Sequence, residues 1–179
     1  RCGVAAGRFS DPGLGYQWLY TNSGNNAFDK TNSTGETLAG SIAGSDVGCY
    51  EAWQKCTGDP SVIVAVLDDG VMYTHPDLAG NIWVNDKEEL YAGTDADGNG
   101  YKDDRYGYNF VHNTAAISWT DVCDIGHGTP ESGTIAALNN GYGVCGIAGG
   151  DGTKDSGVKI MICQVVAGEN SVSLNGEAQ

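Results

Sequence analysis

The sequence predicts an α/β fold built on a parallel β-sheet. Residues 61–68 form a nearly continuous apolar run, which is typical of a strand buried on both faces of such a sheet. A helical pattern follows over residues 131–138, and residues 158–166 form a second apolar run. Strand, helix and strand joined by short connections indicate an α/β architecture.

The region before the first strand predicts an arm and a short helix. Residues 1–45 are rich in Gly, Ser, Thr and Asn, and we expect an extended arm on the body of the protein, anchored by Trp18 and Tyr20. Asp46 is a suitable N-cap for a helix that ends before the first strand. The main domain is therefore expected to span residues 46–179.

The six cysteines do not define a disulfide pattern by themselves. Cys49 and Cys56 stand two turns apart in the expected helix, roughly 10 Å along its axis. A disulfide requires Cα atoms within about 7 Å of each other, so we expect these two cysteines not to pair.

Charge excludes one class of partner. The net charge is −14, from 23 acidic and 9 basic residues. Nucleic-acid binding is not expected, because it needs a basic surface. The acidic excess is compatible with solubility alone or with binding of hard cations. The sequence has no apolar run of ~18 residues, so we expect no membrane span.

An aspartate and a histidine stand where catalytic groups are often found. Asp68 ends the first predicted strand, and carboxyl ends of strands gather functional groups in α/β sheets. Alone, Asp68 or Asp69 would be read as a cap for the next segment. His127, however, stands between Gly126 and Gly128 at a predicted helix start. We therefore predict a catalytic pair, in which the carboxylate orients the imidazole and the imidazole moves a proton.

Oxygen-bearing side chains recur at alternate positions between residues 95 and 104, a spacing that predicts a calcium loop. Gly100 takes the place where such a loop turns sharply, but Tyr106 stands where an EF-hand has glutamate. We expect a calcium loop without the EF-hand frame; the alternative is a solvated acidic turn. The expected ligands are Asp95, Asp97, Asn99, Tyr101 (through its carbonyl), Asp103 and Asp104.

Several segments together resemble a known family, the subtilisin-like serine proteases. These segments are residues 65–70, 75–78, 126–129, 133–137, 138–144, 146–148 and 158–165. Residues 46–179 resemble the amino-terminal part of that catalytic domain, and Asp68 before His127 is the order of its triad. The resemblance implies a parallel-sheet, subtilisin-like three-layer fold, incomplete in this chain. It also implies peptide-bond hydrolysis, peptide or protein substrates, and a secreted or cell-surface protein.

The resemblance implies two further sets of residues. A second calcium site is implied at Asp77, the Asn140 side chain, and the carbonyls of Leu138, Tyr142 and Val144. A substrate-binding edge is implied at Gly168, Glu169 and Asn170.

The sequence also departs from the family. It has no counterpart of the Gly-Thr-Ser nucleophile motif or of the oxyanion-hole asparagine, so we expect this chain alone to be inactive. A second chain carrying the rest of the domain is the expected partner. Pro130 and Glu131 replace a His and an apolar residue, and Glu131 shares a helix face with His127. The alternative function is therefore an inactive calcium-binding scaffold of the same fold.

Overall fold

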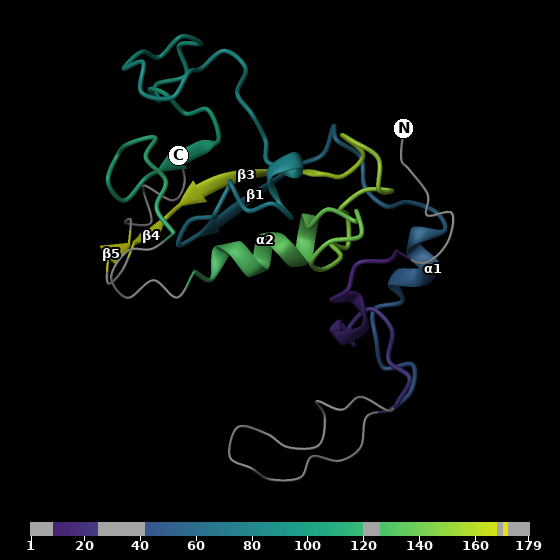
Figure 1. The fold of residues 1–179 in the computed structure, drawn as a ribbon. Helices are drawn as coiled ribbons and strands as arrows, with labels where there is room; N and C mark the ends of the chain where they lie inside the picture. The colour runs from purple at the N-terminus through teal and green to yellow at the C-terminus, as the bar shows by residue number, and fades with distance from the viewer. Residues whose placement is uncertain (1–8, 25–41, 120–125, 168–169, 172–179) are drawn as a thin grey trace.

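A parallel three-stranded sheet carries the structure. The computed structural model describes residues 9–24, 42–119, 126–167 and 170–171. Strands β1 (Ile63–Asp68), β3 (Lys159–Gln164) and β2 (Gly107–Asn109) lie side by side in that order, all parallel. Helix α2 (Gly128–Ala136) lies along one face of the sheet (Figure 1). This arrangement confirms the expected α/β class.

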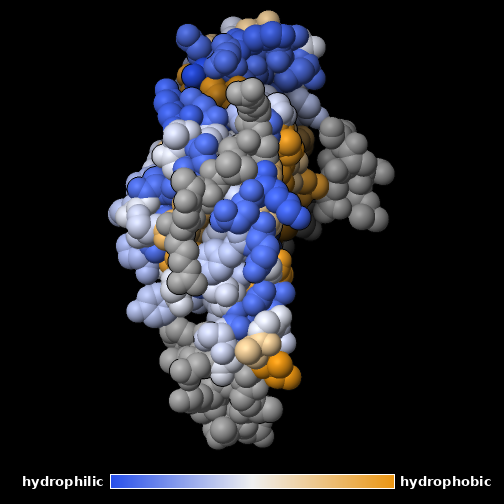
Figure 2. Space-filling view, turned by 90° about the vertical axis from the view of Figure 1, so that its right-hand side faces the viewer, coloured by the Kyte–Doolittle hydropathy of each residue, from blue (hydrophilic) through white to orange (hydrophobic). Residues whose placement is uncertain are grey.

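The remaining elements are short. They are the 3₁₀ turns η1 (Leu14–Tyr16) and η3 (Ala79–Asn81), helix α1 (Cys49–Trp53), and the antiparallel strands β4 (Val166–Ala167) and β5 (Asn170–Ser171). The described residues include no helix long and apolar enough to cross a membrane. Hydrophilic residues cover most of the face seen in Figure 2, as the acidic composition leads one to expect.

The core lies between the sheet and α2. Side chains alternate along a strand, so every second residue of β1 and β3 faces the helix. Val66 on β1 and Ile160 and Ile162 on β3 are buried there, with Ala136 of α2 and Leu78 completing the same cluster. The same alternation puts Asp68, two residues after Val66, on the face that α2 covers.

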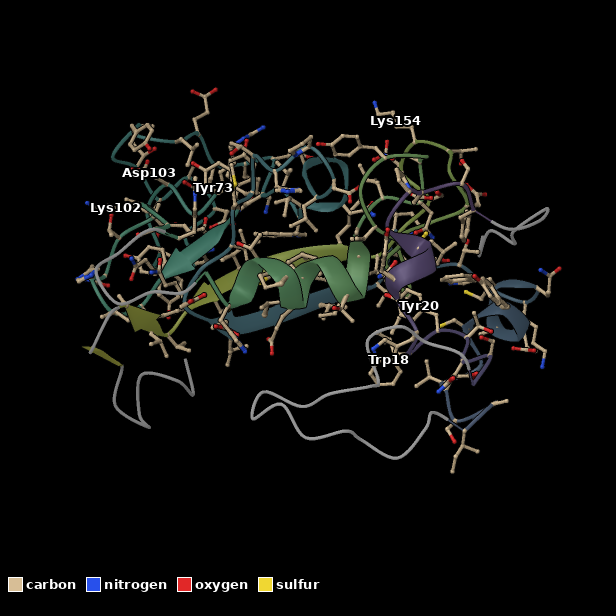
Figure 3. The ribbon with its side chains drawn as sticks, turned by 60° about the horizontal axis from the view of Figure 1, so that its bottom comes forward. Trp18, Tyr20, Tyr73, Lys102, Asp103 and Lys154 are labelled. Carbon is tan, nitrogen blue, oxygen red and sulfur yellow. The ribbon has the colours of Figure 1, made fainter. Side chains whose placement is uncertain are left out.

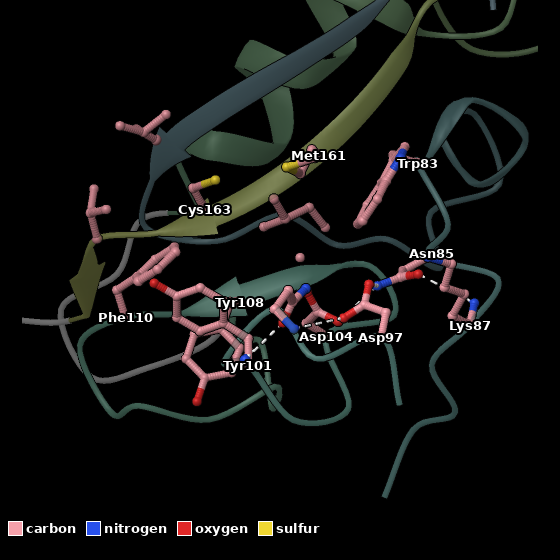
Figure 4. Close-up of a pocket in the computed structure, with 15 residues that line it drawn as sticks. Trp83, Asn85, Lys87, Asp97, Tyr101, Asp104, Tyr108, Phe110, Met161 and Cys163 are labelled. Carbon is pink, nitrogen blue, oxygen red and sulfur yellow. Dashed lines mark hydrogen bonds between the residues drawn. The ribbon is translucent and has the colours of Figure 1, made fainter. Parts of the chain in front are cut away.

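The other face of the sheet is partly open. Ile63 is 47% and Leu67 53% exposed, so burial of β1 on both faces is not found among the described residues. A cavity of about 550 Å³ lies against this face, with Trp83 on its rim and Met161 and Cys163 of β3 on its floor (Figure 4). One helical layer covers the described sheet, so the part of the chain in view gives two of the three expected layers.

Strand β2 has no counterpart among the sequence predictions, because three residues are too few to show a period. Gly107 explains why it pairs closely with β3. Its φ is 122°, and a Cβ there would lie 1.9 Å from the carbonyl oxygen of Ile162. Only glycine allows this approach.

The helix predicted to start at Asp46 begins three residues later. Gly48, with φ 64°, precedes α1, and the Asp46 carboxylate accepts the Gly48 N–H at 2.9 Å and the Asn22 N–H at 2.8 Å. Asp46 therefore ties the arm to the body instead of capping the helix. Cys49 is a free thiol, which confirms that it does not pair with Cys56. Cys56 follows the end of α1, and its disulfide partner lies outside the described residues.

The arm is anchored by Tyr20 and not by Trp18, which is 43% exposed. Tyr20, labelled with Trp18 in Figure 3, is buried. Its hydroxyl donates to the Cys145 carbonyl at 2.8 Å and approaches the Thr134 carbonyl at 3.3 Å. Gln17 adds two hydrogen bonds to the backbone of Cys145. The described arm residues thus share a second apolar cluster with α1, centred on Trp53.

An isoleucine-to-alanine change should reduce the free energy of unfolding by different amounts on the two faces of the sheet. Ile160→Ala should reduce the free energy of unfolding by about 2–5 kcal/mol, because it leaves a cavity in the core. Ile63→Ala, a matched change on the open face, should cost much less. Thermal or denaturant unfolding of both variants measures the difference. Equal losses would contradict this description of the core.

Candidate active site

Asp68 is presented at the carboxyl end of β1, on the side that α2 covers. Its Oδ1 accepts the N–H of Asp69 at 2.6 Å, which fixes the carboxylate plane. Its Oδ2 lies 2.8 Å from Nδ1 of His127, so the structure brings the two predicted residues into direct contact. The side chain of Asp68 is 14% exposed, whereas that of His127 is 54% exposed.

Asp69 fixes the start of α2 from a distant part of the chain. Its Oδ2 accepts the His127 N–H at 2.8 Å and its Oδ1 accepts the Gly128 N–H at 2.7 Å. These are backbone groups at the helix start, which have no partner within the helix. The helix consequently begins at Gly128, directly after His127 and three residues before the helical pattern of residues 131–138. Sequence analysis gave Asp69 no more than a possible local capping role.

The other ring nitrogen of His127 points toward Glu131. Its Nε2 lies 3.7 Å from Glu131 Oε1, in the i,i+4 relation expected on one helix face. The Glu131 side chain is 50% exposed. Ser132, the next residue, is fully buried within α2, so its hydroxyl is not exposed to a substrate.

The contacts shift the pKa values of both groups. Burial opposes ionisation of Asp68, but the hydrogen bonds from Asp69 N–H and His127 outweigh it and hold its pKa below the usual carboxyl range. The hydrogen bond and charge of Asp68, followed by the charge of Glu131, raise the pKa of His127. The resulting carboxylate only accepts hydrogen bonds, so Nδ1 carries the proton that faces Asp68. In the neutral ring, Nε2 is then the proton acceptor.

A carboxylate that sequence analysis missed lies at the centre of the 95–104 loop. Glu88 is fully buried, and its Oε1 accepts the N–H of Ala96 at 2.5 Å and of Asp97 at 3.1 Å. Oxygens of Glu88, Asp95 and Asp97 all lie within 4.8 Å of one another. Among the described residues, no Lys or Arg side chain forms an ion pair with them. Three close carboxylates without a counter-charge fit a hard divalent cation.

The other predicted side-chain ligands, Asn99, Asp103 and Asp104, form hydrogen bonds within and around the loop. The N–H of Tyr101 donates to Asn99 Oδ1 at 2.8 Å. The Asn85 amide donates to Asp97 and Asp104, and the Asn99 amide donates to Asp104 at 2.9 Å (Figure 4). Oδ1 of Asp103 accepts the Gly93 N–H at 2.7 Å. These bonds shape the loop around the three grouped carboxylates.

Asp77 and Asp11 form a second place where buried carboxylates meet the same loop. Asp77 Oδ2 accepts the Val144 N–H at 2.9 Å and the Asp77 backbone carbonyl accepts the Leu138 N–H at 2.8 Å, so both ends of the 138–144 loop contact this residue. Asp11 of the arm reaches the same loop and accepts the N–H groups of Asn140 and Gly141. Burial, and then the charge of Asp11, raises the pKa of Asp77. No motif or spacing in the sequence marks Asp11 as part of this group.

The two carboxylates at this second place each have an unused oxygen. Asp11 Oδ2 and Asp77 Oδ1 are buried and have no hydrogen-bond partner among the described residues. A buried carboxylate oxygen without a partner is costly, and a hard cation would compensate it. The side-chain oxygen of Asn140, one of the predicted ligands, accepts the Tyr142 N–H at 2.9 Å. The two unpartnered oxygens are therefore compatible with a hard cation at this place.

Most of the predicted substrate-binding edge lies outside the described residues. Gly168 and Glu169 lie outside the described residues. Asn170 is described as part of β5, whose backbone pairs with Ala167 of β4.

The contact between the β1 turn and α2 predicts a sharp difference between two glycines. A Cβ at Gly128 would lie 2.4 Å from the Gly70 carbonyl oxygen and 3.1 Å from Asp68 Cβ, whereas one at Gly133 would meet nothing within 4 Å. Gly128→Ala should lower the melting temperature and, by separating Asp68 from the ring, lower the pKa of His127. Gly133→Ala should do neither. Thermal melts and an NMR titration of His127 provide the test; similar behaviour of the two variants would contradict it.

Comparison with known proteins places the chain in a family. The model of the Subtilase family matches residues 59–178. The Aeromonas extracellular serine protease of Aeromonas sobria is 33% identical over 132 residues, which are 74% of this chain and 16% of that protein. Subtilisin-like protease 1 of Plasmodium vivax is 43% identical over 106 residues, 58% of this chain and 15% of that protein.

A solved structure supports the same assignment. The crystal structure of the Aeromonas sobria serine protease in complex with its chaperone matches 99% of this chain and 23% of that chain, with a TM-score of 0.62 and 26% identity. The chain thus spans only a small part of the relatives it matches. Because the family model covers more than half of its residues, the chain belongs to the subtilase family.

Proposed function

We propose that this chain supplies the aspartate and the histidine of a subtilisin-like serine endopeptidase. The observation that carries the proposal is the 2.8 Å contact between Asp68 Oδ2 and His127 Nδ1 at the carboxyl end of β1. Family membership supports the reaction class, hydrolysis of peptide bonds.

In this proposal Asp68 and His127 have separate roles: Asp68 orients the ring, and His127 transfers the proton. Asp68 holds the ring with Nδ1 protonated and stabilises the imidazolium that forms later. Nε2 of His127 takes the proton of a serine hydroxyl as that oxygen attacks the peptide carbonyl, and then gives it to the leaving amine. The serine and the oxyanion donors come from sequence outside these 179 residues.

We further propose that the rest of the catalytic domain, as a second chain or as more of the same protein, packs against the open face of the sheet. The half-exposed Ile63 and Leu67 support this, because apolar strand residues gain free energy when a partner covers them. Peptide or protein substrates would lie along the edge at Gly168, Glu169 and Asn170.

Calcium is the proposed structural cofactor. One ion would be held by Glu88, Asp95 and Asp97, and a second by Asp11 and Asp77 with carbonyls of the 138–144 loop. Each ion would neutralise buried or crowded carboxylates and hold its loop in place.

A secreted or cell-surface location is proposed on two grounds. The Aeromonas sobria relative is named as an extracellular protease. Cys56 is part of a disulfide, a bond that persists in oxidising compartments.

The triad assignment predicts the effect of removing each group from the full-length protein. Asp68→Ala and His127→Ala should each reduce kcat by roughly 10⁴- to 10⁶-fold, by analogy with other triads. Asp86→Ala, which removes an exposed carboxylate, should leave kcat unchanged. Normal turnover in the His127 variant would mean that the hydrolysis comes from a contaminant, and it would favour the alternative of an inactive scaffold.

The raised pKa of His127 predicts the acidic side of the pH profile. Nε2 accepts a proton only when the ring is neutral, so kcat/KM should fall as pH drops through the raised pKa of His127, above the ordinary histidine value. Glu131→Gln removes one of the negative charges that raise it, so this limb should move to lower pH. Glu89→Gln is the matched control. High salt should shrink the difference, because Glu131 is solvent-exposed.

Calcium removal should destabilise the full-length protein. At a free concentration one hundred times Kd, a bound ion stabilises the native state by about 2.7 kcal/mol per site. Glu88→Gln and Asp77→Asn should each remove part of the calcium dependence of the melting temperature, whereas Asp86→Asn should not. Melting curves with calcium and with chelator measure this; elemental analysis that finds no calcium would contradict the proposal.

A further inference from the structure

The two ring nitrogens of His127 have different neighbours and different roles in the proposed proton transfer. Nδ1 is occupied by Asp68 at 2.8 Å, but Nε2 lies beside the Glu131 carboxylate at 3.7 Å. One ligand-capable atom from each of Asp68, His127 and Glu131 lies within 4.8 Å of the others. This group contains an imidazole nitrogen, which distinguishes it from the two all-carboxylate groups.

The distance between Nε2 and Oε1 is close to what one metal ion needs. Zinc binds imidazole nitrogen at about 2.0–2.1 Å and carboxylate oxygen at about 2.0–2.2 Å, which in tetrahedral geometry separates the two ligand atoms by about 3.4 Å. The observed 3.7 Å differs from this by a few tenths of an ångström. Glu131 is half-exposed, so its side chain is free to make that adjustment without repacking the core.

Asp68 fixes the tautomer of the His127 ring, which leaves Nε2 unprotonated for a metal ion as well as for a proton. A metal-binding histidine usually donates its other N–H to a carboxylate, which fixes the tautomer and strengthens the ligand. Here Nδ1–H faces Asp68, so the free lone pair is on Nε2, which lies 3.7 Å from Glu131 Oε1. His127 is 54% exposed on its side chain, which leaves room for water to complete the coordination.

We propose that His127 Nε2 and the Glu131 carboxylate bind a zinc ion, with Asp68 orienting the ring, and that this ion reversibly inhibits the protease. The inhibition rests on the proposed function, because an ion on Nε2 occupies the lone pair that must accept the serine proton. Zinc binding itself does not depend on the proposed function. Ions that favour nitrogen ligands, such as zinc, would bind here, whereas calcium and magnesium prefer oxygen.

The test uses the full-length protein in excess calcium, with zinc binding measured by calorimetry and peptide hydrolysis measured separately. Zinc should bind with one site that His127→Ala abolishes, and a zinc-selective chelator should restore hydrolysis. Glu131→Gln should weaken zinc binding at least tenfold. Glu131→His, which places two imidazoles at i and i+4, should keep or strengthen it. Glu89→Gln, an exposed control, should bind like the unchanged protein.

Two results would overturn the proposal. One is zinc affinity that is the same in the unchanged protein, Glu131→Gln and Glu131→His. The other is zinc binding that survives His127→Ala. If the full-length protein hydrolyses no peptide but calorimetry follows the expected order, the zinc site stands and only the proposed protease function fails. Circular dichroism of each variant verifies that it is folded.

Discussion

The carboxylate of Asp69 is the interaction on which the arrangement of the candidate active site depends. It joins the end of β1 to the start of α2 through the backbone N–H groups of His127, which precedes the helix, and of Gly128, its first residue. Hydrogen bonds donated to an ionised acceptor are roughly twice as strong as neutral ones, and this pair is largely shielded from water. Asp68 can meet the imidazole only because its neighbour has already brought the helix start to the strand end. The adjacent aspartates therefore divide the work: one places the backbone and the other places the ring.

Close backbone packing makes that junction possible. Gly128 rests against the Gly70 carbonyl, and Gly107 rests against β3 in a similar manner. The chain replaces side-chain packing by backbone contact where functional groups converge.

Sequence patterns predicted the elements that carry strong periodicity or motifs. The apolar runs gave both long strands, and the paired motifs at Asp68 and His127 identified two side chains that the fold does bring into contact. The patterns failed where long-range contacts decide. Asp46 has the chemistry of a helix cap but bonds to Asn22 instead, and β2 exists because Gly107 fits against Ile162. Glu88 and Asp11 lie at the proposed cation sites although they come from outside the recognised segments, and no local spacing marks them.

Leu67 and Asp68 are adjacent in sequence yet serve opposite sides of β1. The first lies on the open apolar face, and the second meets His127. The pairing of Leu67 with Cys163 and of Asp68 with Gln164 fixes which residue faces which way. A shift of β1 by a single residue against β3 would exchange these orientations, turning the carboxylate into the apolar layer and a leucine toward the imidazole. The identity of the site therefore depends on the alignment of two strands as much as on the residues themselves.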